Sequence, residues 1–599
     1  MNRRHFLKSS VALPALSIFS SCVTTPEAGA ARVRPGDVGW PSDASWEELS
    51  RAVGGRLIKI ESPLAACQKD PSACTELFGR IKNPFYIGDH PAFTQTSGWI
   101  DAWTSKPSAF AVAASNTQDV VAAVNFARQH KLRLVVKGGG HSYQGTSNCE
   151  GSLLVWTRAI NNSISIHEAF VPQGCAGKYP PQAAVNAGAG AIWLHMYEAV
   201  TTRAGRYVQG GGCTTVGVAG LVQSGGFGSF SKKYGTAAAA LLEAEVVTAD
   251  GTVRTANACS HPDLFWGIKG GGGGSLGIVT KLTLRTRELP EQFGAVFTTI
   301  KAQTDSAFRK LVARIVAFYH DRLFNPHWGE QIIFGPRNTL RISMVFQGLD
   351  RQQATELWRP FIDWVKASPQ DFSAEEPVII DIPARQFWNA EYIKEKYPGF
   401  IVGDDRPGAR ASDFLWQGDH GQVGWVIHGY RSAWMPASLL KQDQQPRLVD
   451  ALFAASRHWR LSLHFNKGLA GAPAEEIAAA ADTATNPAVL DAFALAIVAG
   501  GGPPAFPGIA GHEPNVPVAR EQRREIDRAM DELLKVVEVR GSYVSESDFF
   551  ERSWQQSFWG KNYPRLAAVK KKYDPQGLFF VHHGVGSEQW SADGFTRNP

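Results

Sequence analysis

The hydrophobic pattern is most regular in the part of the chain that leads to the first glycine run. Residues 115–116 can cap a helix in which Val120 and Val124 recur at helical spacing. A short β-branched segment, residues 132–136, comes next and leads into three consecutive glycines at 138–140. The pattern therefore predicts a helix, a strand and a glycine loop, in that order.

The pattern changes between residues 291 and 545, where helical segments alternate with strands. Residues 341–347 and 423–430 alternate polar and apolar side chains with period two, as half-buried strands do. Ile526 and Met530 belong to an apolar stripe at helical spacing, which we interpret as ordinary core packing. This region predicts a second lobe built on an antiparallel sheet covered by helices.

Size and charge limit the classes to which the chain can belong. A chain of 599 residues is too long for one small core, so two lobes or more are expected. The net charge is +6, but the basic residues are spread along the chain, and the longest basic run, 570–572, fits a solvated helix face. Nucleic-acid binding is therefore not expected. The cysteine spacing contains no CxxC pair, and no metal site is expected either.

The first 30 residues have the character of a targeting segment rather than of a folded domain. Arg3-Arg4 precede a short apolar run, residues 11–19, as in a twin-arginine export signal. Cys22 follows this run as in a lipoprotein cleavage box. We therefore expect an exported protein that is periplasmic or anchored to the membrane by a lipid at Cys22. No later apolar segment is long enough to span a bilayer.

Three glycine runs, 138–140, 210–212 and 270–274, carry the clearest chemical signal in the sequence. Glycine allows positive φ and close approach of the backbone to a ligand, so successive N–H groups can converge on an anion. None of the runs has the spacing of a Rossmann dinucleotide loop or of a P-loop. The runs therefore predict a phosphate-containing cofactor that is bound by another kind of fold.

Four segments resemble motifs of one flavoprotein superfamily. Residues 136–145 resemble the flavin-attachment loop of the vanillyl-alcohol oxidase / p-cresol methylhydroxylase (PCMH) superfamily. Residues 212–217 are similar to the second attachment loop of its berberine-bridge-enzyme-like branch, and residues 263–280 and 562–580 resemble two further motifs of that branch. The resemblance implies an α+β fold with a two-lobed, PCMH-type FAD-binding domain and a substrate domain.

The resemblance also implies how the chain is divided. A signal would occupy residues 1–30, an N-terminal wrap residues 31–100, and the FAD-binding PCMH-type domain residues 101–290. The substrate domain would cover residues 291–545. A berberine-bridge-like segment, residues 546–599, would then return to the FAD-binding domain.

Carried over to this sequence, the resemblance implies one FAD bonded to the protein at two points. His141 would be bonded to the flavin 8α-methyl group and Cys213 to C6, through an imidazole nitrogen and a thiolate. The other residues expected to bind the FAD are Lys137, Gly138, Gly139, Gly140, Ser142, Tyr143, Gly212, Thr215, Val216, Gly217, Gly277, Ile278, Val279 and Asn562.

Val216, three residues after Cys213, bears on the electron acceptor. In the resembling branch a small valine there is associated with access of oxygen to the reduced flavin. We therefore expect an FAD-dependent oxidase that takes a hydride from an alcohol, a sugar hemiacetal or a similar C–H donor, with O2 reduced to H2O2. The alternatives are a flavin dehydrogenase that passes electrons to a quinone or a redox partner, and a non-catalytic flavin-binding protein.

The sequence offers several candidates for the catalytic base. The resembling branch often has a Tyr shortly before the residue that corresponds to Asn562, but this chain has Phe558 there. His582 and His583 are candidates, because an imidazole can titrate near neutral pH. The alternative for this pair is that backbone hydrogen bonds hold both rings.

Two strands of the second lobe offer further candidate bases. Period two places His428 and Tyr430 on one face with Val426, and it places His464 on a polar face with Asn466. Either face would suit the lining of a substrate site. Plain exposure to solvent explains each face nearly as well.

Seven cysteines are present, of which Cys22 and Cys213 are assigned above. The remaining five are Cys67, Cys74, Cys149, Cys175 and Cys259. Export favours disulfides. Cys67 and Cys74 close a short loop, and Cys149 and Cys175 bracket another, which leaves Cys259 as a buried free thiol.

Overall fold

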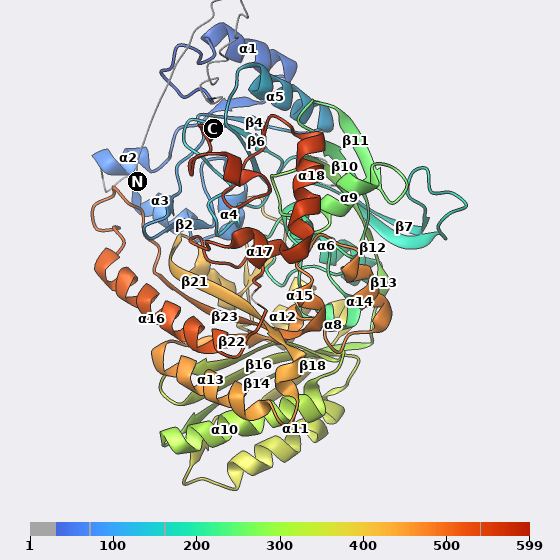
Figure 1. The fold of residues 1–599 in the computed structure, drawn as a ribbon, viewed down its shortest axis with the longest axis vertical. Helices are drawn as coiled ribbons and strands as arrows, with labels where there is room; N and C mark the ends of the chain where they lie inside the picture. The colour runs from blue at the N-terminus through green and yellow to red at the C-terminus, as the bar shows by residue number, and fades with distance from the viewer. Residues whose placement is uncertain (1–30, 71–73, 161–162, 540, 599) are drawn as a thin grey trace, which may run out of the picture.

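The computed structural model describes residues 31–70, 74–160, 163–539 and 541–598 (Figure 1). The predicted export signal, residues 1–30, and the predicted lipid anchor at Cys22 lie outside the described residues. Within the described part of the chain, no helix is both long and apolar enough to cross a membrane.

A four-stranded sheet in the order β1-β4-β6-β5 forms the first half of the lobe that the sequence predicts to bind FAD, called the FAD-binding lobe below. Its strands are β1 (Leu57–Lys59), β4 (Phe110–Ala113), β5 (Leu134–Lys137) and β6 (Leu153–Trp156). Helix α5 (Thr117–Gln129) precedes β5, and the side chain of its N-cap Asn116 accepts a hydrogen bond from the Asp119 N–H at 3.1 Å. The predicted helix and strand before the first glycine run are therefore confirmed.

A five-stranded antiparallel sheet, β11-β10-β12-β8-β7, forms the second half of this lobe. Its strands are β7 (Ile164–Phe170), β8 (Gln182–Gly188), β10 (Leu241–Val247), β11 (Val253–Asn257) and β12 (Ile278–Arg285). The third glycine run lies between helix α9 (Pro262–Ile268) and β12, so strand geometry fixes one end of it.

The disulfides differ in part from the prediction. Cys67 and Cys74 are bonded as expected, but Cys175 is bonded to Cys259, 84 positions away, and Cys149 is free. The predicted Cys149–Cys175 pair and the free Cys259 are therefore wrong. The loop after β7 folds against the end of β11, where Asn257 Nδ2 donates to the Gln173 carbonyl at 3.0 Å, so the sheet brings together cysteines that are distant in sequence.

A ten-stranded sheet forms the second lobe, in the order β17-β14-β16-β15-β22-β23-β21-β2-β3, with β18 beside β14. Its strands are β2 (Thr96–Trp99), β3 (Trp103–Thr104), β14 (Gln292–Ala302), β15 (Trp328–Gly335), β16 (Thr339–Gln347), β17 (Phe372–Ala374), β18 (Val378–Pro383), β21 (Trp425–Pro436), β22 (Leu461–His464) and β23 (Ala492–Gly502). All pairs are antiparallel except β2 with β21.

Four helices cover one face of this sheet, as Figure 1 shows. They are α10 (Asp305–Phe318), α11 (Arg351–Lys366), α13 (Gln445–His458) and α16 (Val516–Leu534). Their apolar sides and the strands share one buried core, which includes the predicted stripe residues Ile526 and Met530. The predicted α+β class and the helix-covered antiparallel sheet are therefore confirmed.

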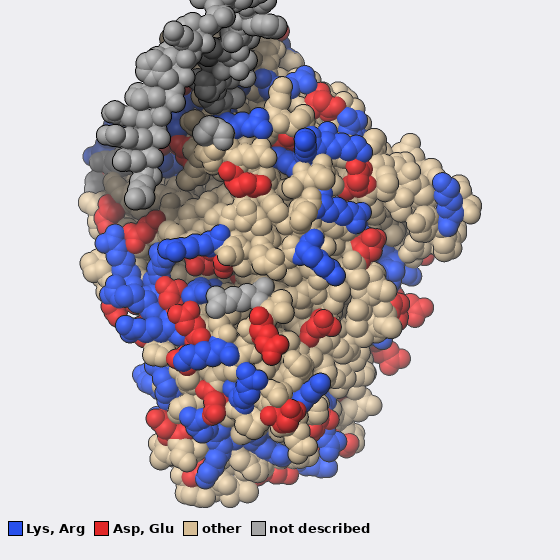
Figure 2. Space-filling model, in the orientation of Figure 1, with Lys and Arg blue, Asp and Glu red and all other residues tan. Residues whose placement is uncertain are grey.

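The C-terminal segment returns to the FAD-binding lobe through α17 (Trp554–Trp559) and α18 (Tyr563–Tyr573). Lys570 on α18 is buried, and its Nζ donates to the Ser275 carbonyl at 2.7 Å and to Asp574 at 2.6 Å. Only Lys571 and Lys572 of the basic run face solvent, so the predicted solvated face is wrong for Lys570. On the face drawn in Figure 2, basic and acidic side chains are interspersed.

Candidate active site

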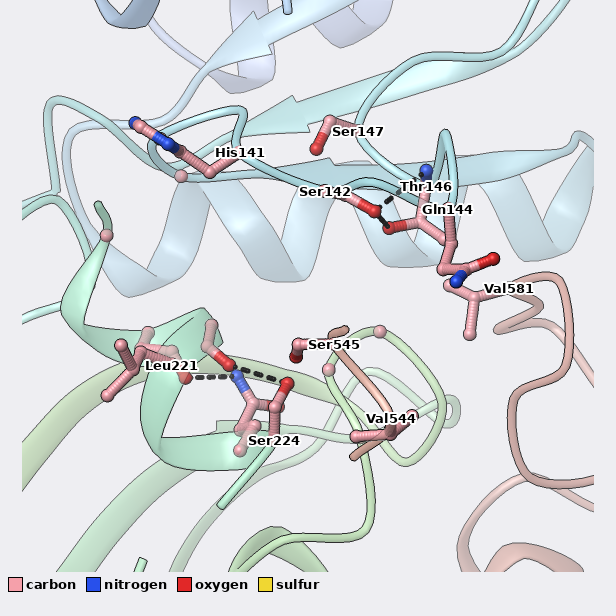
Figure 3. Close-up of a pocket in the computed structure, with 18 of the residues that line it drawn as sticks. His141, Ser142, Gln144, Thr146, Ser147, Leu221, Ser224, Val544, Ser545 and Val581 are labelled. Atoms are coloured by element: carbon pink, nitrogen blue, oxygen red, sulfur yellow. Dashed lines mark hydrogen bonds between the residues drawn. The ribbon is translucent and has the colours of Figure 1, made fainter. Parts of the chain in front are cut away.

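A cavity of about 450 Å³ is bordered by both lobes and by the C-terminal segment. Most of its lining residues come from segments 138–144, 211–217, 272–279, 464–467, 543–546 and 580–584; Glu330 and residues of segments 134–136, 146–147, 219–227 and 558–559 also line it. In Figure 3 the loop that carries His141 to Ser147 forms one wall. Leu221 and Ser224 of α7 (Val218–Gln223 and its C-cap) lie opposite, with Val544 and Ser545 beside them.

The first two glycine loops touch backbone to backbone. A Cβ atom on Gly139 would lie 2.7 Å from the Gly217 nitrogen, closer than a side-chain carbon can approach. Next to this contact, His141 Nε2 lies 2.9 Å from Thr215 Oγ1. The loops that carry His141 and Cys213 are therefore direct neighbours, and both residues line the same cavity.

The imidazole of His141 is neutral at ordinary pH. Burial lowers the pKa of His141 to about 4, and the hydrogen bond with Thr215 offsets only part of this effect. Because Nε2 is engaged by Thr215, Nδ1 is the nitrogen available for a bond to a ligand. A neutral imidazole with a free lone pair is the form that attachment to a flavin requires.

Cys213 is held as a thiol. Burial and then the carboxylate of Asp419 raise the pKa of Cys213 well above its ordinary value, and Cys213 in turn forms a hydrogen bond with Asp419. Burial also raises the pKa of Asp419. This places an acidic group beside the predicted second attachment point, a contact that no motif in the sequence indicated.

The glycine-rich loops fit a phosphate-bearing cofactor such as FAD. Gly140, Gly272 and Gly274 have positive φ values of 77°, 90° and 77°, which glycine adopts without strain. Loops with such residues can direct successive N–H groups at an anion. Within the described chain, Ser275 Oγ on the cavity wall is buried without a hydrogen-bond partner. An oxygen of a bound phosphate or sugar would supply that partner.

The structure separates the predicted cofactor residues into three groups. Lining the cavity are Gly138, Gly139, Gly140, His141, Ser142, Tyr143, Gly212, Cys213, Val216, Gly217, Gly277, Ile278 and Val279. Thr215 is not among the lining residues, but its Oγ1 forms a hydrogen bond with His141 Nε2. Lys137 and Asn562 hold the surrounding chain: Lys137 Nζ donates to the carbonyls of His90, Pro91 and Phe93 at 2.7–2.9 Å, and Asn562 Nδ2 donates to the carbonyl of Thr485 at 2.9 Å.

His582 and His583 line the cavity as part of an aromatic stack. The His582 ring lies 3.7 Å from Phe549, nearly parallel, and its Nε2 lies 2.8 Å from the Phe549 carbonyl. Burial, and then the neighbouring His582, lower the pKa of His583 to about 3. His583 therefore does not titrate near neutral pH, so that part of the prediction is wrong, while the backbone-bonded alternative holds for His582.

His428 and Tyr430 do not share a face. The register of β21 against β23 shifts between Ile427 and Gly429, which inserts one extra residue at His428. His428 Nδ1 lies 2.8 Å from Gln522 of α16, on the helix side of the sheet. Tyr430 lies on the other side, with its ring 5.3 Å from Tyr143, so the prediction of a common face is wrong. Neither residue is among those that line the cavity.

His464 and Asn466 both line the cavity. The His464 Nε2 lies 2.9 Å from Ser462 Oγ, and burial followed by the nearby Lys467 lowers the pKa of His464 well below its ordinary value. His464 is therefore neutral and partly engaged.

Three charged residues of the cavity escaped the sequence reasoning. Lys467 Nζ forms an ion pair with Glu546 Oε1 at 2.6 Å, and Glu330 lies near them on β15. Burial raises the pKa of Glu330. No local pattern marks these residues, because the sheet and the returning C-terminal segment bring them together from three distant parts of the chain.

Comparisons with known proteins give the same picture. A family described as "FAD binding domain" matches residues 108–257, and one described as "Berberine and berberine like" matches residues 542–586. The FAD-linked oxidoreductase malF of Malbranchea aurantiaca is 28% identical over 596 residues, which cover 94% of this chain and 93% of malF.

Two solved structures share the fold. The VAO-type flavoprotein MtVAO615 from Myceliophthora thermophila is 25% identical, with a TM-score of 0.76, over 94% of this chain and 99% of that one. The Acremonium strictum glucooligosaccharide oxidase is 19% identical, with a TM-score of 0.60, over 82% and 93%. The chain therefore has the fold of vanillyl-alcohol-oxidase-type flavoproteins.

Two kinds of similarity identify the activity. Family models match two separate parts of the chain that line the cavity, and the relatives match nearly the whole chain. The chain is an FAD-linked oxidoreductase, and it is similar to proteins of the vanillyl-alcohol oxidase / berberine-bridge-like group. The resemblance inferred from the four sequence motifs is confirmed.

Proposed function

We propose that the protein is an oxidase whose FAD is bonded to both His141 and Cys213. One observation carries this proposal: His141 Nε2 lies 2.9 Å from Thr215 Oγ1, two residues from Cys213, on the wall of one cavity. A neutral imidazole and a thiol beside a carboxylate then face the same space from two loops. Bound FAD would accept a hydride from the substrate and pass the electrons to dioxygen, with hydrogen peroxide as product.

The chain's own residues would position the cofactor and the substrate. His141 and Cys213 would fix the flavin ring, the glycine runs would hold the phosphates, and the stack that includes His582 would cover one side of the cavity. Val216 lines the cavity close to Cys213, which supports dioxygen as the acceptor rather than a quinone or a redox partner. The proposed substrate is an alcohol or sugar hemiacetal, in keeping with the name of the glucooligosaccharide oxidase that shares the fold.

Acid denaturation of the purified protein tests the attachment. Yellow colour should stay with the polypeptide, and should persist in each of the single variants His141→Ala and Cys213→Ala but be lost in the double variant. Release of all flavin from the wild-type protein would reject covalent attachment. A peroxide screen over alcohols and oligosaccharides tests turnover, and reduced flavin that survives for minutes in air would favour the dehydrogenase.

We also propose that the protein is exported, either to the periplasm or to a lipid-anchored position. The Cys67–Cys74 and Cys175–Cys259 disulfides support an oxidising compartment. Fractionation of expressing cells, with an Arg3→Lys, Arg4→Lys variant as control, tests this: retention of the wild-type protein in the cytoplasm would contradict export.

A further inference from the structure

Glu330 has a backbone conformation that a glutamate rarely adopts. Its φ is +63°, within strand β15, where it stands opposite Met344 of β16. A left-handed residue other than glycine costs free energy, and such strain persists only where the surroundings impose it. The contact of the preceding residue, Gly329, accounts for this strain. A Cβ on Gly329 would lie 1.8 Å from the Ser229 carbonyl oxygen, so the strand packs directly against the backbone of the FAD-binding lobe at this point.

The carboxylate of Glu330 is held from one side only. Ser229 Oγ donates to Glu330 Oε1 at 2.6 Å, and Asn466 Nδ2 approaches the same oxygen at 3.4 Å. Within the described chain neither of these hydrogen bonds uses Oε2, and Glu330 lines the cavity. The carboxylate is therefore oriented by protein donors while one oxygen stays available to a ligand.

Asn466 provides a second, independent sign of a ligand. Its side chain is only 3% exposed and lines the cavity, yet within the described chain its Oδ1 has no hydrogen-bond partner. Rotation of the side-chain amide by a half turn would not satisfy Oδ1, because Oδ1 would then face the Glu330 carboxylate. A buried acceptor without a donor is costly, so a bound molecule that supplies an O–H or N–H group is the natural partner.

The charges of the cavity narrow the class of that molecule. Among the described residues that line the cavity, Glu330 and Glu546 are the carboxylates and Lys467 is the one Lys or Arg, with its Nζ already paired with Glu546. Asp419 adds a third acidic group beside Cys213. Anionic substrates would be repelled by this surplus of carboxylates. Neutral polyols and cationic amino alcohols would find acceptors at Glu330 and Asn466.

Glu330 lines the same cavity as Cys213, the predicted second point of flavin attachment. After burial and Asp419, the charge of Glu330 contributes to raising the pKa of Cys213. In the flavin ring C6 and N5 are bonded to the same fused carbon atom, so a group near a sulfur on C6 is near the atom that receives a hydride. This step rests on the proposed function.

We propose that Glu330 is the catalytic residue that accepts the substrate's hydroxyl proton, and that the cavity selects neutral or cationic substrates rich in O–H or N–H groups. The C–H hydrogen leaves the substrate as a hydride to the flavin, the O–H proton passes to Glu330 Oε2, and the O–H electron pair forms the C=O bond. The substrate is oxidised by two electrons and the flavin is reduced by two. His464, His582 and Glu546 are engaged with other groups, whereas Oε2 of Glu330 is available.

Calorimetric binding of two small polyols tests the acceptor site without turnover. Tris, a cationic triol, should bind the wild-type holoenzyme at least tenfold more tightly than 2,2-bis(hydroxymethyl)propionate, its anionic analogue. Glu330→Gln keeps the shape and should abolish this preference, whereas Glu330→Asp keeps the charge and should retain it. The exposed Glu291→Gln is the matched control and should behave as the wild type.

Anaerobic flavin reduction tests the chemical role, with the first substrate found in the peroxide screen. Glu330→Gln should slow reduction by about 10²- to 10⁴-fold, the range for loss of a general base, and remove the acidic limb of its pH profile. If Glu330→Gln carries covalent flavin but keeps the wild-type preference for Tris, or the wild-type rate of flavin reduction, the inference about Glu330 is overturned while the proposed function stands. Preference for Tris without any bound flavin would reject the proposed function and leave Glu330 as a binding residue only.

Discussion

Replacement of Gly139 by alanine should force the two flavin loops apart. The new Cβ would lie 2.7 Å from the Gly217 nitrogen, 2.8 Å from the Thr215 carbonyl oxygen and 3.3 Å from the His141 ring. The first two contacts are with backbone, which cannot swing away as a flexible side chain can. The φ of Gly139 is not in the left-handed region, so alanine suits the local backbone and the steric contact alone sets the effect.

Overpacking of this kind costs about 1 to 3 kcal/mol. A loss of about 2 kcal/mol lowers the melting temperature of a cooperative unit of roughly 200 residues by about 4 to 8 °C. Because Thr215 holds His141 through a 2.9 Å hydrogen bond, separation of the loops should also reduce the fraction of protein with flavin bonded to His141. Differential scanning fluorimetry measures the first effect, and flavin fluorescence on a denaturing gel of Gly139→Ala in the Cys213→Ala background measures the second.

Gly79→Ala is the control. Gly79 lies in helix α3 (Thr75–Arg80) with no atom within 4 Å of the added Cβ, so alanine should leave the melting temperature unchanged or raise it slightly. If Gly139→Ala has the same melting temperature as Gly79→Ala and carries a full complement of His141-bonded flavin, the close approach of the two loops is refuted.

Three further variants probe separate contacts. Thr215→Val keeps the volume but removes the hydroxyl bonded to His141, and should lower flavin occupancy at His141 with a stability loss of about 1 kcal/mol, seen by peptide mass spectrometry and thermal melting. Lys137→Met removes the Nζ that donates to the carbonyls of His90, Pro91 and Phe93, and should cost about 2 to 4 kcal/mol; an unchanged melting temperature would contradict this. The pKa of His583 falls from 6.5 to about 3 on folding, so the unfolded chain binds a proton that the folded chain does not, and stability falls as pH drops from about 6.5 toward 3. His583→Phe should reduce this loss of stability at acidic pH. Parallel curves of melting temperature against pH for the variant and the wild type would contradict this prediction.

The sequence predicted what is encoded over short distances. The capped helix, the strand and the glycine loop at 138–140 depend on neighbouring residues, and all three are present. The attachment candidates His141 and Cys213 were found for the same reason, since each lies within a recognisable loop. Both side chains line one cavity, although covalent bonding itself stays a prediction.

Features that depend on distant packing could not be predicted. Cys175 meets Cys259 only after the β7–β8 loop folds against β11, and the extra residue in β21 depends on its pairing with β23. The left-handed conformation of Glu330 likewise goes with the close contact between the preceding Gly329 and Ser229 of the other lobe, a contact that the local sequence does not reveal. Period-two reasoning fails at such places because a single bulge reverses the faces of all the residues that follow.

One short segment of the FAD-binding lobe links the two halves of the site. Ser229 is bonded to Glu330, and three residues later the buried Lys232 donates from Nζ to the substrate-lobe carbonyls of Gly468 and Ala470 at 3.0 and 2.8 Å. Moving the lobes apart would leave the buried Lys232 cation and several carbonyl acceptors without partners, which would cost several kcal/mol of free energy. These contacts hold Glu330 against the FAD-binding lobe without any ligand. If Glu330 is the proposed proton acceptor, this preorganisation would suit hydride transfer, because the donor carbon and the proton acceptor must be aligned at the same moment.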